Sequence, residues 1–169
     1  MDAFSIRPMA PTDNRVVAEI IRSVMTEFGA VGQGYSIEDP EVDAMYEAYQ
    51  TPRSCFYVVT TPDRVVGCGG LGPLLGGDSE TCELKKMYYL PLARGRGLGR
   101  RLLERLIGDA RALGYRQMYL ETLVRMEGAN RLYRKLGFVP LAGPWGATGH
   151  CGCDHFYVLD LATSPSAPD

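Results

Sequence analysis

The chain has 169 residues, of which 46% are hydrophobic and 22% are charged, so it is long enough to bury the core of one globular domain. Its formal net charge of −2 gives no overall basic field, which argues against a nucleic-acid partner. No apolar run approaches the ~20 residues that cross a bilayer, and the first residues do not follow the pattern of a signal peptide. The five cysteines are an odd number, which suits a reducing compartment. We therefore expect a cytoplasmic protein with no membrane partner, either a monomer or a homodimer.

Strand and helix signals alternate in the first half of the chain. β-branched and aromatic residues favour the strands, and turn residues at 62–64 favour a hairpin between two of them. The predicted elements are a strand at 4–7, a helix from Thr12 or Asp13 to Phe28, a flexible cover at 29–49 with a short helix at Glu41–Tyr49, a hairpin of Cys55–Thr61 and Val65–Leu71, and a strand at Thr81–Leu90.

Helical periodicity returns after Gly97, where leucines line one face of a helix that ends at Gly114. The elements predicted after it are a strand at Tyr115–Leu123, a helix at Glu127–Leu136 with Gly137 as its C-cap, and strands at Phe138–Leu141 and Phe156–Leu161. No repeat and no internal linker divides the chain. We therefore expect one domain over residues 1–162 and a disordered tail at 163–169.

The segment that opens the long helix combines glycine with arginine. It consists of Arg94, Gly95, Arg96, Gly97, Leu98, Gly99 and Arg100. Alternating glycines let backbone N–H groups converge, and the helix adds the positive end of its dipole, so an anion is the natural ligand. Guanidinium groups also pair well with phosphate oxygens. The alternative is a glycine-rich turn with solvated arginines.

Two common nucleotide-binding motifs do not fit this segment. A P-loop needs four residues between its glycines and then Gly-Lys-Ser/Thr, which the chain does not contain. The dinucleotide pattern G-x-G-x-x-G fails from Gly95, because Arg100 stands at its last glycine position. A literal match at 67–72 follows a strand, but Pro73 and the residues after it cannot open the helix that must follow.

The remaining pattern is Arg94-x-x-Gly97-x-Gly99 after a strand, followed about 30 residues later by a short helix that contains Tyr133 and ends in Gly137-Phe138. In this order of elements, the chain from about Cys55 to Phe138 closely resembles the Gcn5-related N-acetyltransferase (GNAT) superfamily. The resemblance implies an α/β (α+β) fold with a central, mixed but mainly antiparallel sheet of about six to seven strands, flanked by about four helices.

The resemblance also implies a binding site for acetyl-coenzyme A (acetyl-CoA) as co-substrate, with no metal. In the superfamily, amides of the loop that matches Gly95 to Arg100 bind the pyrophosphate. The end of the preceding strand, here Met87, Tyr88 and Tyr89, hydrogen-bonds the pantetheine like an added strand. Several members carry an Asn where this chain has Met126, and Asn130 is our candidate for the replacement.

Amine acetylation needs a base for the amine and an acid for the departing thiolate. The resemblance makes Glu83 the first candidate for the base and Glu121 the second. Strand alternation puts Glu83, Lys85, Met87 and Tyr89 on one face, so Glu83 would look toward the acyl site. The alternative for either glutamate is a carboxylate paired with a neighbouring Lys or Arg.

Tyr133 matches the superfamily tyrosine that stands near the coenzyme sulfur, so the resemblance makes it the general acid. The alternative for Tyr133 is a core aromatic on a helix. Residues 150–155 hold four potential zinc ligands, but their spacing is too close for a closed tetrahedral set, so we expect a loop that borders the acceptor pocket. The cover is acidic, and its carboxylates either attract a cationic amine or form a solvated helix face. They are Glu38, Asp39, Glu41, Asp43 and Glu47.

These features predict an N-acetyltransferase that acts on a primary amine of a small molecule or amino acid derivative. One alternative is a protein N-terminal or lysine acetyltransferase, which would need an open groove for peptides. Another is a non-catalytic acyl-CoA sensor, against which the presence of Glu83, Glu121 and Tyr133 together speaks. The arginine cluster from Arg94 to Arg105 lacks the interleaved aromatics of a nucleic-acid site.

Overall fold

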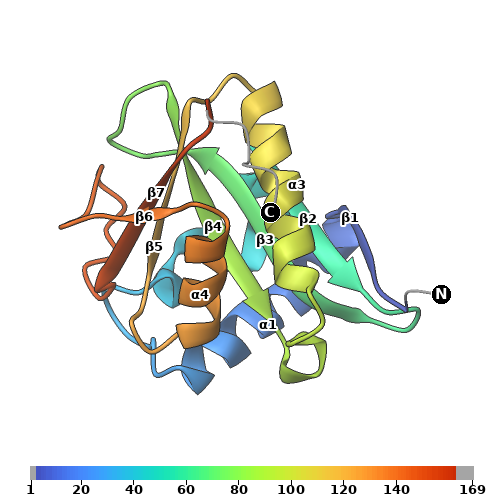
Figure 1. The fold of residues 1–169 in the computed structure, drawn as a ribbon. Helices are drawn as coiled ribbons and strands as arrows, with labels where there is room; N and C mark the ends of the chain where they lie inside the picture. The colour runs from blue at the N-terminus through green and yellow to red at the C-terminus, as the bar shows by residue number, and fades with distance from the viewer. Residues whose placement is uncertain (1–2, 163–169) are drawn as a thin grey trace.

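The structure is a computed structural model that describes residues 3–162, so the tail predicted at 163–169 lies outside the described residues. One seven-stranded sheet forms its centre, with the strand order β1-β2-β3-β4-β5-β7-β6 (Figure 1). All neighbouring strands are antiparallel except β4 and β5, which are parallel. The predicted mixed, mainly antiparallel sheet is therefore confirmed.

The strands are β1 (Ser5–Pro8), β2 (Cys55–Thr60), β3 (Val65–Pro73), β4 (Thr81–Tyr89), β5 (Gln117–Thr122), β6 (Val139–Pro140) and β7 (His155–Asp160). The α-helices are α1 (Asn14–Glu27), α2 (Met45–Ala48), α3 (Leu98–Ala112) and α4 (Glu127–Lys135). Short 3-10 helices lie at Pro11–Asp13, Ser36–Glu38, Pro40–Ala44 and Pro91–Ala93. No helix in the described range 3–162 is long and apolar enough to cross a membrane.

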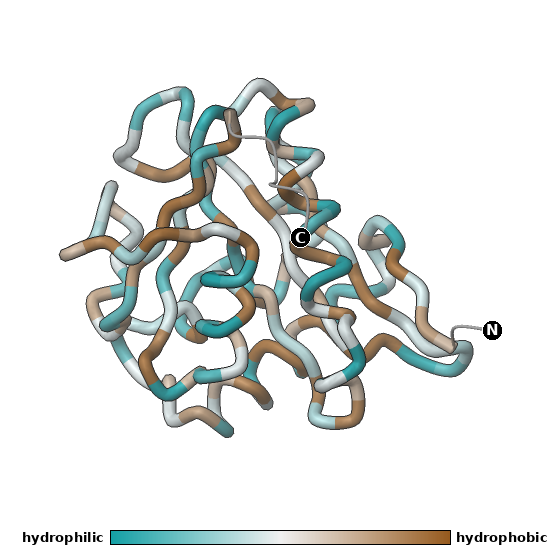
Figure 2. The backbone as a smooth tube through the Cα atoms, in the orientation of Figure 1, coloured by the Kyte–Doolittle hydropathy of each residue, from teal (hydrophilic) through white to brown (hydrophobic). Residues whose placement is uncertain are grey.

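Helices cover both faces of the sheet and create two apolar clusters. The α3 leucines at 98, 102, 103 and 106 pack on one face together with Tyr133 of α4. Val17, Ile20, Ile21 and Val24 of α1 pack on the other face. Figure 2 shows hydrophilic and hydrophobic residues interleaved along α3, as expected for a helix with one buried side.

The cover differs from the single short helix predicted at Glu41–Tyr49. It forms a 3-10 helix at Pro40–Ala44, and only Met45–Ala48 is α-helical. The backbone of Ala44 has φ −139° and ψ 45°, which lies outside the helical region and separates the two pieces. Val42 and Met45 are buried and attach this segment to the α1 side of the sheet.

Strand β4 contains a bulge that the sequence pattern does not reveal. Lys86 has φ 51°, and the β3–β4 register shifts between Cys68 and Gly70, which pair with Tyr88 and Lys85. The extra residue reverses the alternation, so Met87 and Tyr89 pack in the same cluster as Leu84 and Cys82. The prediction that Glu83 shares a face with Met87 and Tyr89 is therefore wrong. Glu83 lies between Cys82 and Leu84 and points to the opposite side.

The sheet splits between β4 and β5. These strands pair only where Thr81–Glu83 meets Gln117–Tyr119, and they separate beyond that point (Figure 1). The backbone edge of β4 from Leu84 to Tyr89 therefore has no β5 partner. This edge leads directly to the glycine-arginine loop and α3.

Candidate active site

A cavity of about 70 Å³ lies at the split between β4 and β5. It brings together Glu83, Glu121 and Tyr133, the predicted base candidates and acid, although they come from β4, β5 and α4. Met87 and Tyr88 of the predicted coenzyme site also line it. The cover contributes Tyr35 and Ser36, and the loop before β7 contributes His150 and Cys153.

Glu83 is a buried carboxyl group with little direct support. Its side chain is 5% exposed and makes no hydrogen bond within the described part of the chain. The nearest cation is Lys85, whose Nζ lies 3.9 Å from Oε2. Burial raises the pKa of Glu83 to about 7, against the opposing charge of Lys85. Glu83 can therefore accept and release a proton near neutral pH.

Glu121 is surrounded by donors. The Tyr119 hydroxyl donates to Oε1 at 2.8 Å, and the Thr148 hydroxyl lies 2.8 and 3.0 Å from the two carboxylate oxygens. The Tyr119 hydroxyl in turn accepts a hydrogen bond from the backbone N–H of Trp145. His150 Nδ1 lies 3.6 Å from Oε2. These donors occupy lone pairs of both carboxylate oxygens.

His150 links the cover to the centre of the cavity. Its Nε2 lies 3.0 Å from both oxygens of Asp39. The hydrogen bond to Asp39, with the further one to Glu121, raises the pKa of His150 to about 9. The imidazole is therefore an imidazolium at neutral pH. Prediction from sequence placed this residue only in a loop bordering the pocket, because its partner Asp39 is 111 residues away.

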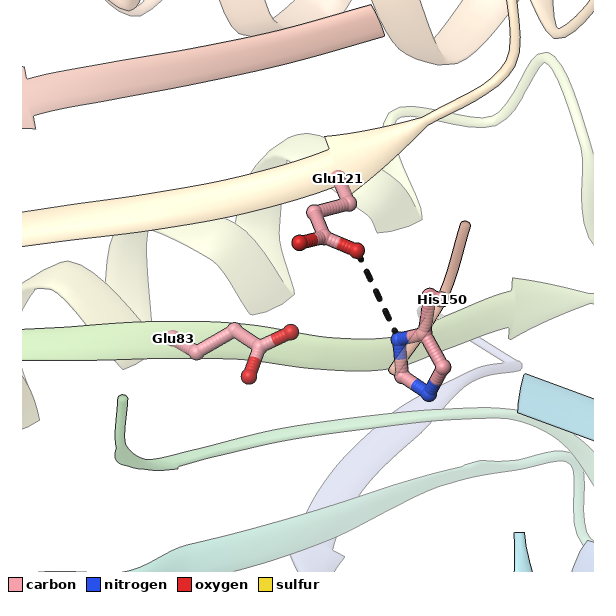
Figure 3. A group of neighbouring side chains, drawn as sticks. All are labelled: Glu83, Glu121 and His150. Carbon is pink, nitrogen blue, oxygen red and sulfur yellow. Dashed lines mark ion pairs between the residues drawn. The ribbon is translucent and has the colours of Figure 1, made fainter. Parts of the chain in front are cut away.

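Glu83, Glu121 and His150 point toward one another (Figure 3). One ligand atom from each lies within 4.8 Å of the others, so the group has the composition of a metal site. Both ring nitrogens of His150 face carboxylates, however, and a metal would have to displace the imidazolium proton. That no metal is needed stays a prediction.

Lys86, the residue of the bulge, points to the cover. Its side chain is 2% exposed, and Nζ lies 2.7 Å from Asp39 and 2.6 Å from Glu41. Burial lowers the pKa of Lys86, but the charges of Glu41 and Asp39 outweigh burial and raise it. Two of the predicted acidic residues thus neutralise a buried lysine. Another, Asp43, pairs with Arg22 at 2.7 Å.

Tyr133 combines a core position with access to the cavity. Its ring packs against Phe138 and Tyr157, with centroids 5.7 and 5.8 Å away. Burial raises its pKa, so the hydroxyl keeps its proton. Tyr133 lines the cavity, and no hydrogen bond of its hydroxyl is found among residues 3–162. The two interpretations of Tyr133 from the sequence are therefore compatible.

The glycine loop has the backbone expected of an anion site. Gly95 and Gly97 have φ 69° and 74°, a left-handed conformation that favours glycine, and a Cβ at either position would meet nothing within 4 Å. Gly97 is the N-cap of α3, and no side chain caps the first turn. The first amides of α3 are therefore open to a ligand. A Cβ at Gly99 would lie 3.2 Å from Leu132, so Gly99 allows α3 and α4 to approach.

The loop arginines have partners within the protein. Arg94 forms two hydrogen bonds to Glu27, at 2.7 and 2.6 Å, and donates to the carbonyl oxygen of Tyr89. Arg96 donates to the Leu92 carbonyl oxygen, and Arg100 pairs with Glu104. Arg94 thus ties α1 to the loop, and a phosphate contact would require it to exchange partners. Such contacts of all three arginines stay predictions.

Asn130 has a different environment from the predicted coenzyme contact. Its side-chain amide donates to the carbonyl oxygens of Leu123 and Met126, and so holds the turn between β5 and α4. Its Oδ1 is buried without a partner among the described residues. This acceptor could receive one hydrogen bond from a ligand, so the role of Asn130 stays a prediction. The hydroxyl of Tyr89 donates to the Leu98 carbonyl oxygen and stabilises the start of α3.

Comparisons with known proteins agree with this arrangement. The model of the acetyltransferase (GNAT) family matches residues 17–138. The uncharacterized N-acetyltransferase YjgM of Escherichia coli (strain K12) is 39% identical over 157 residues, covering 92% of this chain and 94% of that protein. The L-methionine sulfoximine/L-methionine sulfone acetyltransferase of Salmonella typhimurium is 27% identical over 140 residues, 82% of each chain. The structure of yncA from Salmonella typhimurium with its cofactor acetyl-CoA superposes with a TM-score of 0.77 at 27% identity, over 99% of this chain and 100% of that one.

Proposed function

The chain belongs to the acetyltransferase (GNAT) family, and we propose that it transfers an acetyl group from acetyl-CoA to the primary amine of a small molecule or amino acid derivative. The observation that carries this proposal is the cavity at the β4–β5 split. There a buried carboxyl group with a pKa of about 7 and a buried tyrosine hydroxyl share one small space. A base and an acid thus lie next to the free edge of β4.

The donor side of the proposal rests on backbone groups. The open amides at the start of α3, from Gly97 onward, suit a pyrophosphate, because helix N-termini favour anions. The unpaired edge of β4 at Met87, Tyr88 and Tyr89 suits the amides of pantetheine, which would add to it like a strand. Acetyl-CoA would then extend from the loop toward the cavity, and its acetyl group would lie near Glu83.

Glu83 is our choice for the general base. Glu121 accepts hydrogen bonds from Tyr119 and Thr148 and lies 3.6 Å from His150, so its oxygens are already engaged by neighbouring side chains. Glu83 lacks such donors, and its pKa of about 7 allows it to take up a proton near neutral pH. A base is most effective when its pKa lies near the working pH, and Glu83 meets this condition.

The proposed reaction has one acid and one base. Glu83 takes a proton from the acceptor ammonium, and the neutral nitrogen forms a bond to the acetyl carbon. A backbone N–H near Met87 to Tyr89 donates to the carbonyl oxygen as negative charge develops on it. The carbon–sulfur bond then breaks, and Tyr133 gives its proton to the departing thiolate. The excess proton that the attacking nitrogen still carries passes to the tyrosinate oxygen and restores the hydroxyl. The products are the acetylated amine and coenzyme A.

The contacts of the cover favour a small acceptor over a polypeptide. Tyr35 and Ser36 of the cover line the cavity, and Asp39 ties the cover to Lys86 and His150, which also line it. A peptide chain would need an open groove, which these contacts close.

The first test is a panel of amines incubated with acetyl-CoA, with detection of free coenzyme A thiol. We expect thiol release that depends on the amine and on the enzyme. Isothermal titration calorimetry provides the companion measurement of acetyl-CoA binding. Absence of acetyl-CoA binding, or binding without transfer to any amine in a broad panel, would contradict the proposal.

A further inference from the structure

The positive charges that line the cavity differ in their partners. Lys86 has two carboxylates within 2.7 Å, and His150 has both oxygens of Asp39 at 3.0 Å. Among the described residues, the one carboxylate paired with Lys85 is Glu83, at 3.9 Å, which is too long for a hydrogen bond. Its side chain is 24% exposed and lines the cavity. Within residues 3–162, Lys85 is thus the lining cation without a hydrogen-bonded carboxylate.

Glu83 is also a poor permanent partner for Lys85. When Glu83 takes the proton of the acceptor amine, it becomes neutral and no longer compensates the ammonium beside it. A partly buried ammonium with no counter-charge is unfavourable. An anionic group on the acceptor would compensate Lys85 both before and after this proton transfer.

We propose that Lys85 binds the carboxylate of the acceptor, and that the acceptors are α-amino acids. This inference rests on the proposed function and assigns the chemical class of its substrate. Glu83 and Lys85 stand two positions apart on the segment of β4 before the bulge, so their side chains project to the same side. In an α-amino acid the amine and the carboxylate share one carbon, so the amine can face Glu83 while the carboxylate faces Lys85.

The rest of the lining limits the acceptor further. Lys86 and His150 are already neutralised, so the described lining offers no second free cation for a second carboxylate. Met25, Ala30, Leu123 and Met126 provide apolar surface for an uncharged side chain. A neutral amino acid therefore suits the cavity better than aspartate or glutamate.

The experiment compares three forms of one acceptor. The L-amino acids are assayed first by thiol release, and the best acceptor is then compared with its α-amide and its decarboxylated amine. For the wild type we expect kcat/KM to be ~10- to 100-fold higher for the amino acid than for the other two, since a hydrogen bond to a charged group is lost in each.

Variants of Lys85 then test the residue. Lys85→Met should lower kcat/KM for the amino acid ~10- to 100-fold more than it lowers kcat/KM for the amide and the amine. Lys85→Arg should retain most of the preference for the carboxylate. The amide and amine also report any change that Lys85 causes in Glu83, because they share the base but not the carboxylate. Lys135→Met, at the exposed end of α4, is the matched control and should behave as the wild type.

Some outcomes overturn this inference and leave the proposed function intact. If the wild-type enzyme acetylates amides or plain amines as well as amino acids, the inference is wrong. This test does not need a folded Lys85→Met variant. The inference is also wrong if a folded Lys85→Met variant binds acetyl-CoA normally but loses kcat/KM equally with all three acceptors. By contrast, absence of transfer to any amine overturns the proposed function itself.

Discussion

The proposed coenzyme side and the proposed acceptor side of the site are built in different ways. In this proposal, the coenzyme side consists of the loop from Arg94 to Arg100 and the free edge of β4, and glycine conformations and backbone groups define it. The acceptor side consists of side chains from the cover, β4, β5 and the loop before β7, and the Asp39–His150 pair spans 111 residues. A ligand held by backbone groups needs a local motif, whereas a ligand held by side chains needs the complete fold.

The largest expected effect is a loss of kcat that distinguishes Glu83 from Glu121. Glu83→Gln should lower kcat ~10²- to 10⁴-fold, because it removes the base and preserves the shape of the side chain. Glu121→Gln should cost about tenfold or less, because Glu121 orders its neighbours and does not transfer the proton. Steady-state kinetics at saturating acetyl-CoA measures both variants. A large loss in Glu121→Gln with near-normal Glu83→Gln would reverse the assignment.

Glu83 also leads to a prediction about the pH dependence of the reaction. Glu83 acts as base only when it is deprotonated, so kcat/KM of the wild type should rise with pH through about 7. Glu83→Gln should lose this rise, because the variant has no carboxylate that can take the proton of the acceptor ammonium. Persistence of the rise near pH 7 in this variant would assign it to another group.

Tyr133 lies where the coenzyme side and the acceptor side meet. Tyr133→Phe should lower kcat by about 10²-fold, because the departing thiolate loses its acid. Tyr133 lines the cavity and its hydroxyl makes no hydrogen bond within residues 3–162, so removal of the hydroxyl should leave the melting temperature almost unchanged. Kinetics and a thermal melt together check this prediction. Normal turnover at saturating acetyl-CoA would leave Tyr133 with a packing role alone.

Gly97 tests the coenzyme side independently of the acceptor. Gly97→Glu should raise the Kd for acetyl-CoA ~10- to 100-fold, because a side chain disfavours the left-handed backbone and a negative charge repels phosphate at the helix start. Calorimetry gives this constant directly. Gly108→Glu, an exposed position in the same helix with free space around it, is the control. Equal constants for wild type and Gly97→Glu would mean that the loop does not bind the coenzyme.

The smallest expected effect concerns the ion pair between His150 and Asp39. The folded pKa of His150, about 9, lies above its ordinary value of 6.5, so its contribution to stability is complete below pH 6.5 and is lost as pH rises through 9. His150→Gln should therefore destabilise the protein by about 2 kcal/mol at pH 6 and much less above pH 9. Urea unfolding at both pH values measures this difference. His155→Gln serves as the control, and a pH-independent difference would contradict the ion-pair account.

Local signals explain which predictions from sequence were confirmed. The leucine period of α3 and the glycines before it are encoded within a few residues, and the structure confirms the helix and its start at Leu98. The bulge at Lys86 could not be predicted, because a lysine in the left-handed region has no sequence signature. Its partners Asp39 and Glu41 are also more than 40 residues away along the chain. His150 was missed as a partner of Glu121 for the same reason, since only the folded chain brings the cover and this loop together.

The bulge in β4 also decides which side chains of the strand are exchangeable. Glu83 and Lys85, before Lys86, line the cavity, whereas Met87 and Tyr89, after it, pack in the cluster that contains the α3 leucines. In the proposed function, a substitution at position 83 or 85 would therefore alter the acceptor pocket and leave the packing of Met87 and Tyr89 in place.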